Sequence, residues 1–234
     1  MSPTVVGDNR GMAKERGRRG GWRRPIGWLL ILVGLAMIGY VAWEFYGTNI
    51  VAQHKHREIT SDLRQQWKKG HDFASVEDGD APIRADALIR IPRFGEDYVV
   101  PVLEGVGDSE LAAGFGHFED TADAGKVGNY AVAAHRVTHG QPLRDMPDLQ
   151  PGDQVIVETR VWVYTYVLDT GGDDLVVPFT DGWVLEPLPH NPDGGVEPPQ
   201  TKGGRLITLT TCSELFHTDN RMVAFGHLVQ KERR

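Results

Sequence analysis

Cys212 is the residue of this sequence with the most obvious chemical use. It is the one cysteine among 234 residues, and it follows an apolar run, 205–211, at the start of a polar stretch. A thiolate attacks carbonyl carbon when a proton partner and an oxyanion donor lie nearby. The alternative role for a lone cysteine is that of a small buried hydrophobic residue. The position of Cys212 therefore predicts either a nucleophile or a core residue.

His135 is the candidate proton partner. It ends the apolar run NYAVAAH at 129–135, which predicts a buried strand. The polar His135 side chain would then lie where this strand emerges at the rim of the domain. A structural histidine is the alternative. His139 follows four residues later, but Gly140 and Pro142 disfavour the helix on which two histidines would share a metal. No metal site and no cofactor is predicted.

Arg221 is the candidate oxyanion donor. It begins the next apolar run, 221–229, nine residues after Cys212. Two neighbouring strands joined by a loop of that size bring their ends together, so Arg221 can face Cys212. A surface arginine is the alternative.

The elements that must position these residues are mainly strands. Short β-branched and apolar runs separated by Gly/Pro turns predict seven or eight strands with short helices, which favours a closed barrel or a sandwich. The predicted strands are 87–92, 97–105, 129–135, two within 151–170 that meet near Thr159 and Arg160, 205–211 and 221–229. A helix is expected over 110–113, with Asp108 and Ser109 as its cap and Gly114 as its end, and residues 187–204 are expected to form a loop.

The N-terminal residues predict a membrane anchor. Residues 1–25 hold seven basic and two acidic side chains, a net charge of +5, whereas the other residues hold 18 basic and 30 acidic side chains, a net charge of −12. The run 26–43 carries no charge and would span about 27 Å as a helix, close to the ~30 Å hydrocarbon core. The positive-inside rule then places the N-terminus in the cytoplasm. The alternative is a signal peptide, but the run exceeds the usual signal core and lacks an A-x-A-like cleavage site.

The predicted organisation therefore has four parts. Residues 1–25 are a basic cytoplasmic tail, residues 26–46 a transmembrane anchor, residues 47–84 a partly helical stalk or linker, and residues 85–234 the catalytic domain. In the stalk, Ile59, Leu63 and Trp67 form a narrow helical stripe, and the sequence leaves open whether this helix packs on the domain. An acidic exported domain repels phosphate, so no nucleic-acid binding is expected.

The residues around the candidate site resemble the sortase family. TLTTC at 208–212 is similar to the TLxTC motif of sortases, with Arg221 on the next strand and His135 at the end of an earlier one. The segment GFGHFEDTADAGKVGNYAVAAHRVTHGQPLRDMPDLQPGDQVIV is similar to the region around the sortase histidine, and details such as GxGH and AHR resemble class E sortases of actinobacteria. The sequence departs from the family pattern at two places. Ala134 stands where Gly is usual, and Ser213 and Glu214 stand where a Pro-containing stretch commonly follows the cysteine.

The resemblance implies an eight-stranded sortase β-barrel and a cysteine transpeptidase that acts without a cofactor. Cys212 would attack the Thr–Gly bond of an LPxTG-like or LAxTG-like sorting signal, His135 would transfer protons, and Arg221 would hold the oxyanion or the substrate backbone. Thr210 and Thr211 would make polar substrate contacts. The implied partners are surface proteins with a C-terminal sorting signal, and a peptidoglycan precursor or pilin that supplies the acceptor amine.

The expected location is the cell membrane, crossed once, with the catalytic domain outside. An unpaired thiol in that oxidising compartment invites intermolecular disulfides, which favours a chemical role for Cys212. Two alternatives stay open at this point: a secreted Cys–His hydrolase without transfer, and a non-catalytic membrane-tethered β-domain.

Overall fold

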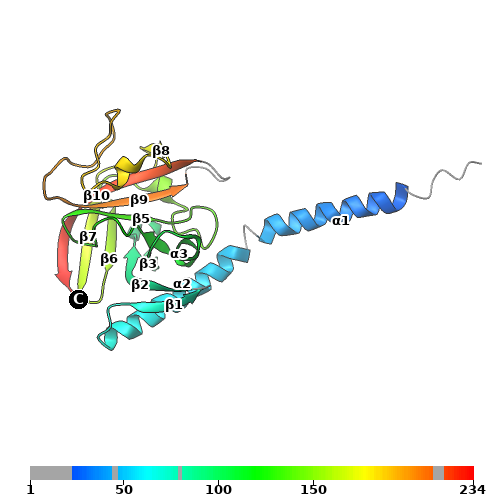
Figure 1. The fold of residues 1–234 in the computed structure, drawn as a ribbon, viewed down its shortest axis with the longest axis horizontal. Coiled ribbons are helices and arrows are strands. Elements are labelled where there is room, and N and C mark those ends of the chain that lie inside the picture. The colour runs from blue at the N-terminus through cyan, green and yellow to red at the C-terminus, as the bar shows by residue number, and fades with distance from the viewer. Residues whose placement is uncertain (1–22, 44–46, 79–80, 213–218) are drawn as a thin grey trace, which may run out of the picture. The chain divides into compact units, whose positions relative to one another are not determined.

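The structure, a computed structural model, describes residues 23–43, 47–78, 81–212 and 219–234 (Figure 1). The chain divides into two compact units, Met1–Ala42 and Trp43–Arg234. Two features singled out in the sequence lie outside the described residues: most of the basic tail, and the pair Ser213 and Glu214.

The described part of the first unit is the helix α1, Arg23–Ala42. Its apolar side chains are exposed, and Ile26, Leu30 and Tyr40 each present at least half of their surface. The predicted anchor, 26–46, extends beyond α1 into residues that are not described. Across the described residues, no helix has the combined length and mean hydropathy required to cross a bilayer.

The second unit is built on a closed ring of eight strands, which confirms the predicted barrel. The ring order is β2-β3-β4-β5-β9-β10-β7-β6, and it closes where β6 pairs with β2. The bounds are β2 Ala81–Arg90, β3 Val100–Glu104, β4 Phe115–His117, β5 Gly128–Ala133, β6 Gln154–Glu158, β7 Trp162–Leu168, β9 Arg205–Cys212 and β10 Asn220–Arg233. Most neighbours are antiparallel, but β3 with β4 and β5 with β9 are parallel.

The burial of the strands matches their sequence patterns. β7 alternates between half-buried and buried residues, as one face of a barrel wall requires. β5 and β9 are buried almost throughout, and their buried polar side chains Asn129 and Thr208 both donate hydrogen bonds to the carbonyl oxygen of Val184, which covers them on the outside. The barrel interior is filled by large side chains with no exposed surface, among them Phe115, Val132, Tyr166 and Leu209.

Most of the predicted elements are present, with shifted ends. The helix predicted over 110–113 is α3, Asp108–Ala113, with Gly107 rather than Asp108 at its N-cap. The region 187–204 contains no helix or strand among its residues, all of which are described, in agreement with the predicted loop. Three short strands escaped prediction: β1 at Ala74–Asp78, which pairs with β2, β4, which pairs with β3 and β5, and β8 at Val176–Pro178, which pairs with β10. The 3-10 helices η2 (Pro92–Phe94), η3 (Met146–Asp148) and η4 (Gly182–Leu185) lie in the connections.

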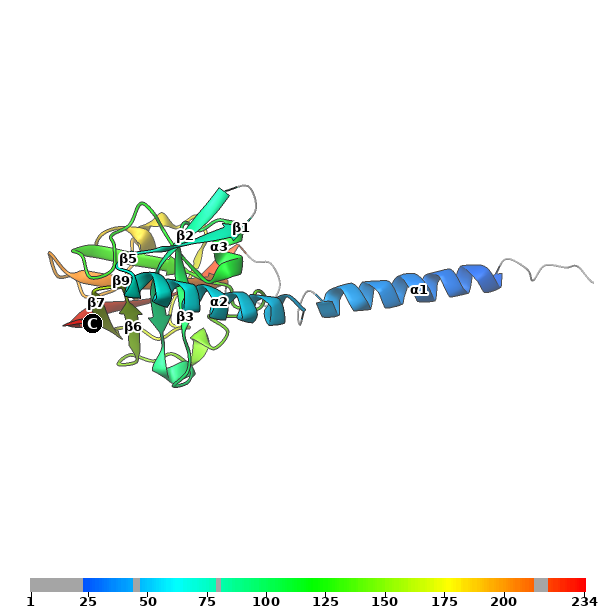
Figure 2. The same ribbon diagram turned by 90° about the horizontal axis from the view of Figure 1, so that it is seen from below.

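The predicted stalk helix is part of the domain. It is α2, Thr48–Lys68, and it packs on β1, β2, β3 and α3 (Figures 1 and 2). Ile59, Leu63 and Trp67 are buried as one stripe, with Ala85 and Leu103 among the residues of the same apolar cluster. The question that the sequence left open is therefore answered in favour of packing. The predicted domain boundary at residue 85 falls inside β2, and the compact unit begins at Trp43.

We expect Leu63→Ala to destabilise the domain. Leu63 has no exposed surface, and truncating a buried leucine typically costs about 2–5 kcal/mol because a cavity remains. Thermal and urea unfolding measure this loss, with Arg64→Ala, an exposed position of the same helix, as the matched control. Equal unfolding free energies for Leu63→Ala and the wild type would show that α2 is not integral to the domain.

Candidate active site

The site is organised by β9, which lies between β5 and β10. Its parallel pairing with β5 places Thr210 opposite Ala133, two residues before His135. Its antiparallel pairing with β10 places Cys212 directly opposite Arg221. Directly opposed residues in an antiparallel pair project to the same face, with Cβ atoms about 4.5–5.5 Å apart. The thiol and the guanidinium therefore share one face at the rim of the barrel.

All five residues predicted for the site line a single cavity of about 500 Å³. They are Thr210, Thr211 and Cys212 at the end of β9, His135 beyond β5, and Arg221 at the start of β10. Cys212 is half-buried. Apolar side chains form most of the remaining wall, among them Val106, Leu111, Phe118, Val177, Phe179 and Leu185.

Thr211 ties the two halves of the site together. Its buried hydroxyl donates a hydrogen bond of 2.7 Å to the carbonyl oxygen of Ala134, and the Ala134 N–H donates to the carbonyl of Thr210 at 3.2 Å. The residues immediately before Cys212 and His135 are thus fixed to each other. In the structure the Thr211 hydroxyl therefore holds the Ala134 backbone in place. The contact with substrate that the family resemblance implies for Thr211 stays a prediction.

The environment of His135 favours the neutral imidazole. Burial, together with the neighbouring His139, lowers the pKa of His135 to about 4, against an opposing effect from Asp108. The His135 and His139 rings are stacked, with centroids 4.7 Å apart and planes 28° apart. At neutral pH the His135 ring is therefore neutral and can act as a proton acceptor in the cavity that it shares with Cys212.

His117, the histidine of the GxGH sequence, has a structural environment. It is buried in β4, where its Nδ1 lies 3.1 Å from Glu104 Oε1 and its Nε2 lies 3.1 Å from Thr121 Oγ1. It lines a different cavity, on the side of Asp86 and Tyr164. Both ring nitrogens are engaged there, which makes His135 the stronger candidate for proton transfer.

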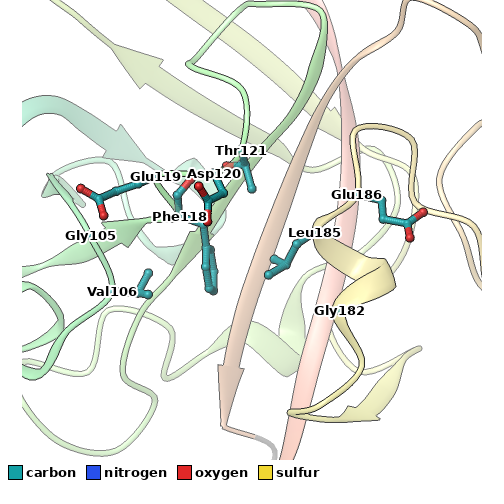
Figure 3. A pocket seen from close by; sticks show the side chains of 9 residues that line it. All are labelled: Gly105, Val106, Phe118, Glu119, Asp120, Thr121, Gly182, Leu185 and Glu186. Atoms are coloured by element: carbon teal, nitrogen blue, oxygen red, sulfur yellow. Dashed lines mark hydrogen bonds between the residues drawn. The ribbon is translucent and has the colours of Figure 1, made fainter.

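A second cavity continues the first one. Its volume is about 330 Å³, and it shares Val106, Phe118, Gly182 and Leu185 with the catalytic cavity. Phe118 and Leu185 face each other across it, and Glu119 and Glu186 lie to either side (Figure 3). The two cavities together form one groove, which extends beyond Cys212, His135 and Arg221.

Sequence reasoning missed three parts of this site. Asp108 was interpreted only as a helix cap, yet it lies close enough to influence His135. The wall formed by β8 and η4 comes from segments too short to show a periodic pattern. The stack of His139 on His135 was also missed, because their four-residue spacing was considered only for a helix.

A closed eight-stranded barrel that presents a thiol, an imidazole and a guanidinium at one rim is the arrangement expected of a sortase-type cysteine enzyme. The comparison with protein families agrees: the family model described as "Sortase domain" matches residues 89–229. The chain belongs to the sortase family, which confirms the enzyme class predicted from the sequence.

Relatives of the sortase E group are among the similar proteins, in agreement with the class predicted from the motifs. Sortase SrtE1 of Streptomyces coelicolor is 33% identical over 90% of this chain, and the chain spans 58% of the length of that relative. Sortase E from Streptomyces avermitilis is 39% identical over 63% of this chain and 89% of the solved one, with a TM-score of 0.55. A solved sortase E1 from Streptomyces coelicolor, described with a tripeptide in its active site, is 32% identical over 63% of this chain and 90% of the other, with a TM-score of 0.52.

We expect Arg221→Ala to lose about 10²–10³ in the rate of acylation, because an oxyanion donor contributes roughly that factor. Arg221→Lys keeps the charge but loses the planar fork of donors, so it should recover only a small part of the loss. Single-turnover acylation and melting temperatures measure both effects. Arg233→Ala, at the exposed far end of β10, is the control. Near-normal acylation in Arg221→Ala would remove Arg221 from the site.

Proposed function

We propose that this protein is a cysteine transpeptidase that cleaves a C-terminal sorting signal and transfers the cleaved protein to an amine. The sulfur of Cys212 bonds to the carbonyl carbon of the signal threonine, and the Thr–Gly amide bond breaks. His135, neutral at rest, accepts the thiol proton of Cys212 and delivers it to the leaving glycine amine. An acceptor amine then attacks the thioester carbonyl, the carbon–sulfur bond breaks, and the proton lost by the amine passes through His135 to the departing sulfur, which restores the thiol.

The observation that carries this proposal is the convergence of three groups in one cavity. The register of β9 and β10 sets Arg221 opposite Cys212, and His135 lines the same wall. A tetrahedral intermediate on Cys212 would carry a negative oxygen, and Arg221 supplies directed N–H donors on the face where that oxygen forms. Membership of the sortase family supports the same assignment.

The shape of the groove supports a peptide substrate. The catalytic cavity is walled by apolar side chains and continues past Phe118 and Leu185 into the second cavity. An extended peptide needs such length, and small apolar side chains before the scissile bond suit such walls. We propose an LAxTG-like or LPxTG-like signal on surface proteins, and a peptidoglycan precursor or pilin amine as acceptor.

The dependence on an added amine tests this function. With an LAxTG or LPxTG peptide and an excess of a glycine or diamino acceptor, we expect a transpeptidation product that replaces hydrolysis. Cys212→Ala should abolish both products, since the chain has no second thiol. Peptide and product are resolved by mass spectrometry.

Each alternative has its own outcome. Cleavage at a rate and with a product that do not depend on amine would identify a Cys–His hydrolase. No cleavage by the wild type, together with a thiol inert to iodoacetamide in the native state, would identify a non-catalytic β-domain.

We also propose that residues 26–46 anchor the protein in the cell membrane, with the N-terminus in the cytoplasm and residues 47–234 outside. The support is the uncharged run 26–43, the basic tail before it, and tryptophan and tyrosine residues near both ends of the run. The apolar side chains along α1 are exposed rather than packed in a core.

Protease added to intact cells tests the topology. We expect it to remove the catalytic domain and leave a short protected N-terminal fragment, detected with an N-terminal tag. Permeabilised cells are the control. A full-length protein that resists protease in intact cells but not in permeabilised cells would place the domain inside.

A further inference from the structure

The ring of His135 has an unusual support. The described residues provide no side-chain hydrogen bond to its nitrogens, so no carboxylate fixes its orientation in the way that an aspartate does in a catalytic triad. Its backbone is held, since the Leu143 N–H donates to the His135 carbonyl at 3.1 Å. The ring itself stacks on the ring of His139.

His139 belongs to a tight turn with a demanding backbone. His139 (φ 53°), Gly140 (φ 84°) and Gln141 (φ 55°) are consecutive residues in the left-handed region, where residues other than glycine are uncommon. The Gln141 N–H donates to the carbonyl of Thr138 at 3.0 Å and closes the turn. A conformation of this kind persists only where surrounding contacts hold it.

Those contacts come from α2. Asn49, in its first turn, accepts a hydrogen bond of 2.8 Å from the Gly140 N–H across 91 residues of sequence. His56, about two turns further along, packs against the same glycine: a Cβ at position 140 would lie 2.7 Å from His56 Cε1. His56 is buried, and burial together with Lys55 and His139 lowers its pKa to about 4. The turn is thus clamped against the helix.

We propose that His139 is a positioning residue that holds the catalytic His135 ring by stacking on it, and that Asn49 and His56 of α2 hold His139 in place. The inference rests on the proposed function of His135 in proton transfer. It gives α2 a role in the chemistry: a helix outside the barrel, and outside the region matched by the family model, fixes the side chain that moves the proton.

The stack also sets the electrostatics of His135. A second imidazole at 4.7 Å shields the ring from water and repels its protonated form, and both effects lower the pKa of His135. Among the described residues, the other charged or titratable groups around it include Asp108 on α3, Cys212 on β9, Arg221 on β10 and Asp181 before η4, with His56 and Lys55 of α2 behind His139. Removal of the His139 ring should therefore raise the pKa of His135 toward its ordinary value of 6.5.

Two substitutions at His139 separate the effect of the stacked ring from that of its nitrogen atoms. His139→Asn removes the ring but suits the turn, because asparagine tolerates the left-handed region. His139→Phe keeps a flat ring for the stack and removes the ring nitrogens. The matched control is His227→Asn, which makes the same substitution on β10, six residues after Arg221. The imidazole that it removes contacts Asp169.

For His139→Asn we expect kcat to fall about 10- to 100-fold with KM nearly unchanged, because small misplacements of a catalytic group cost factors of this size and His139 does not line the substrate cavity. His139→Phe should recover most of kcat. Melting temperatures confirm folding. His139→Asn with wild-type kcat, or His139→Phe as impaired as His139→Asn, would overturn the proposal.

A second measurement does not depend on activity. In the full-length Cys212→Ala protein, NMR titration of labelled histidines reports the pKa of His135 without coupling to the thiol. We expect the lowest pKa with His139 present, an intermediate pKa in His139→Phe and the highest in His139→Asn. The same His135 pKa in all three would contradict the stack. Full activity of His135→Ala would instead contradict the proposed function, so the two failures are distinguishable.

Discussion

The site depends on the pairing of one strand, β9, with two neighbours at once. Its antiparallel register with β10 sets Cys212 opposite Arg221, and its parallel register with β5 sets Thr210 opposite Ala133 and so brings His135 to the same rim. A slip of one residue in either ladder would turn a catalytic side chain to the other face of the barrel. The buried apolar residues of β9 prevent such a slip, because they would lose their place in the core.

The barrel alone does not complete the site. The loop after His135 lies beyond the paired residues of β5 and β9. Its conformation depends on contacts with Asn49 and His56 of α2. The same helix buries Leu63 and Trp67 against the outer side of the barrel, and the guanidinium of Arg234 lies 4.4 Å from the Trp67 ring. One amphipathic helix therefore contributes both to the stability of the domain and to the geometry of its rim.

Much of this arrangement could be predicted from the sequence, and the reasons are local. Long apolar runs such as 129–135 and 205–211 predict strands, and the short Cys212–Arg221 spacing predicts their juxtaposition. The closed ring followed from the resemblance to a family rather than from periodicity. The three-residue strands β4 and β8 carry too few residues for a pattern, and pairing with β5 and β10 stabilises them. The stack of His139 depends on left-handed backbone angles at a histidine, which no periodicity reveals.

The central claim is that Cys212 forms a covalent acyl-enzyme within this groove. Incubation of the full-length protein with an LAxTG or LPxTG peptide, followed by rapid acid quenching and peptide mapping, tests it directly. The account predicts a hydroxylamine-sensitive adduct on Cys212 with the mass of the peptide truncated after threonine. Turnover of the peptide without any adduct on Cys212, or with an adduct on another residue, would contradict it.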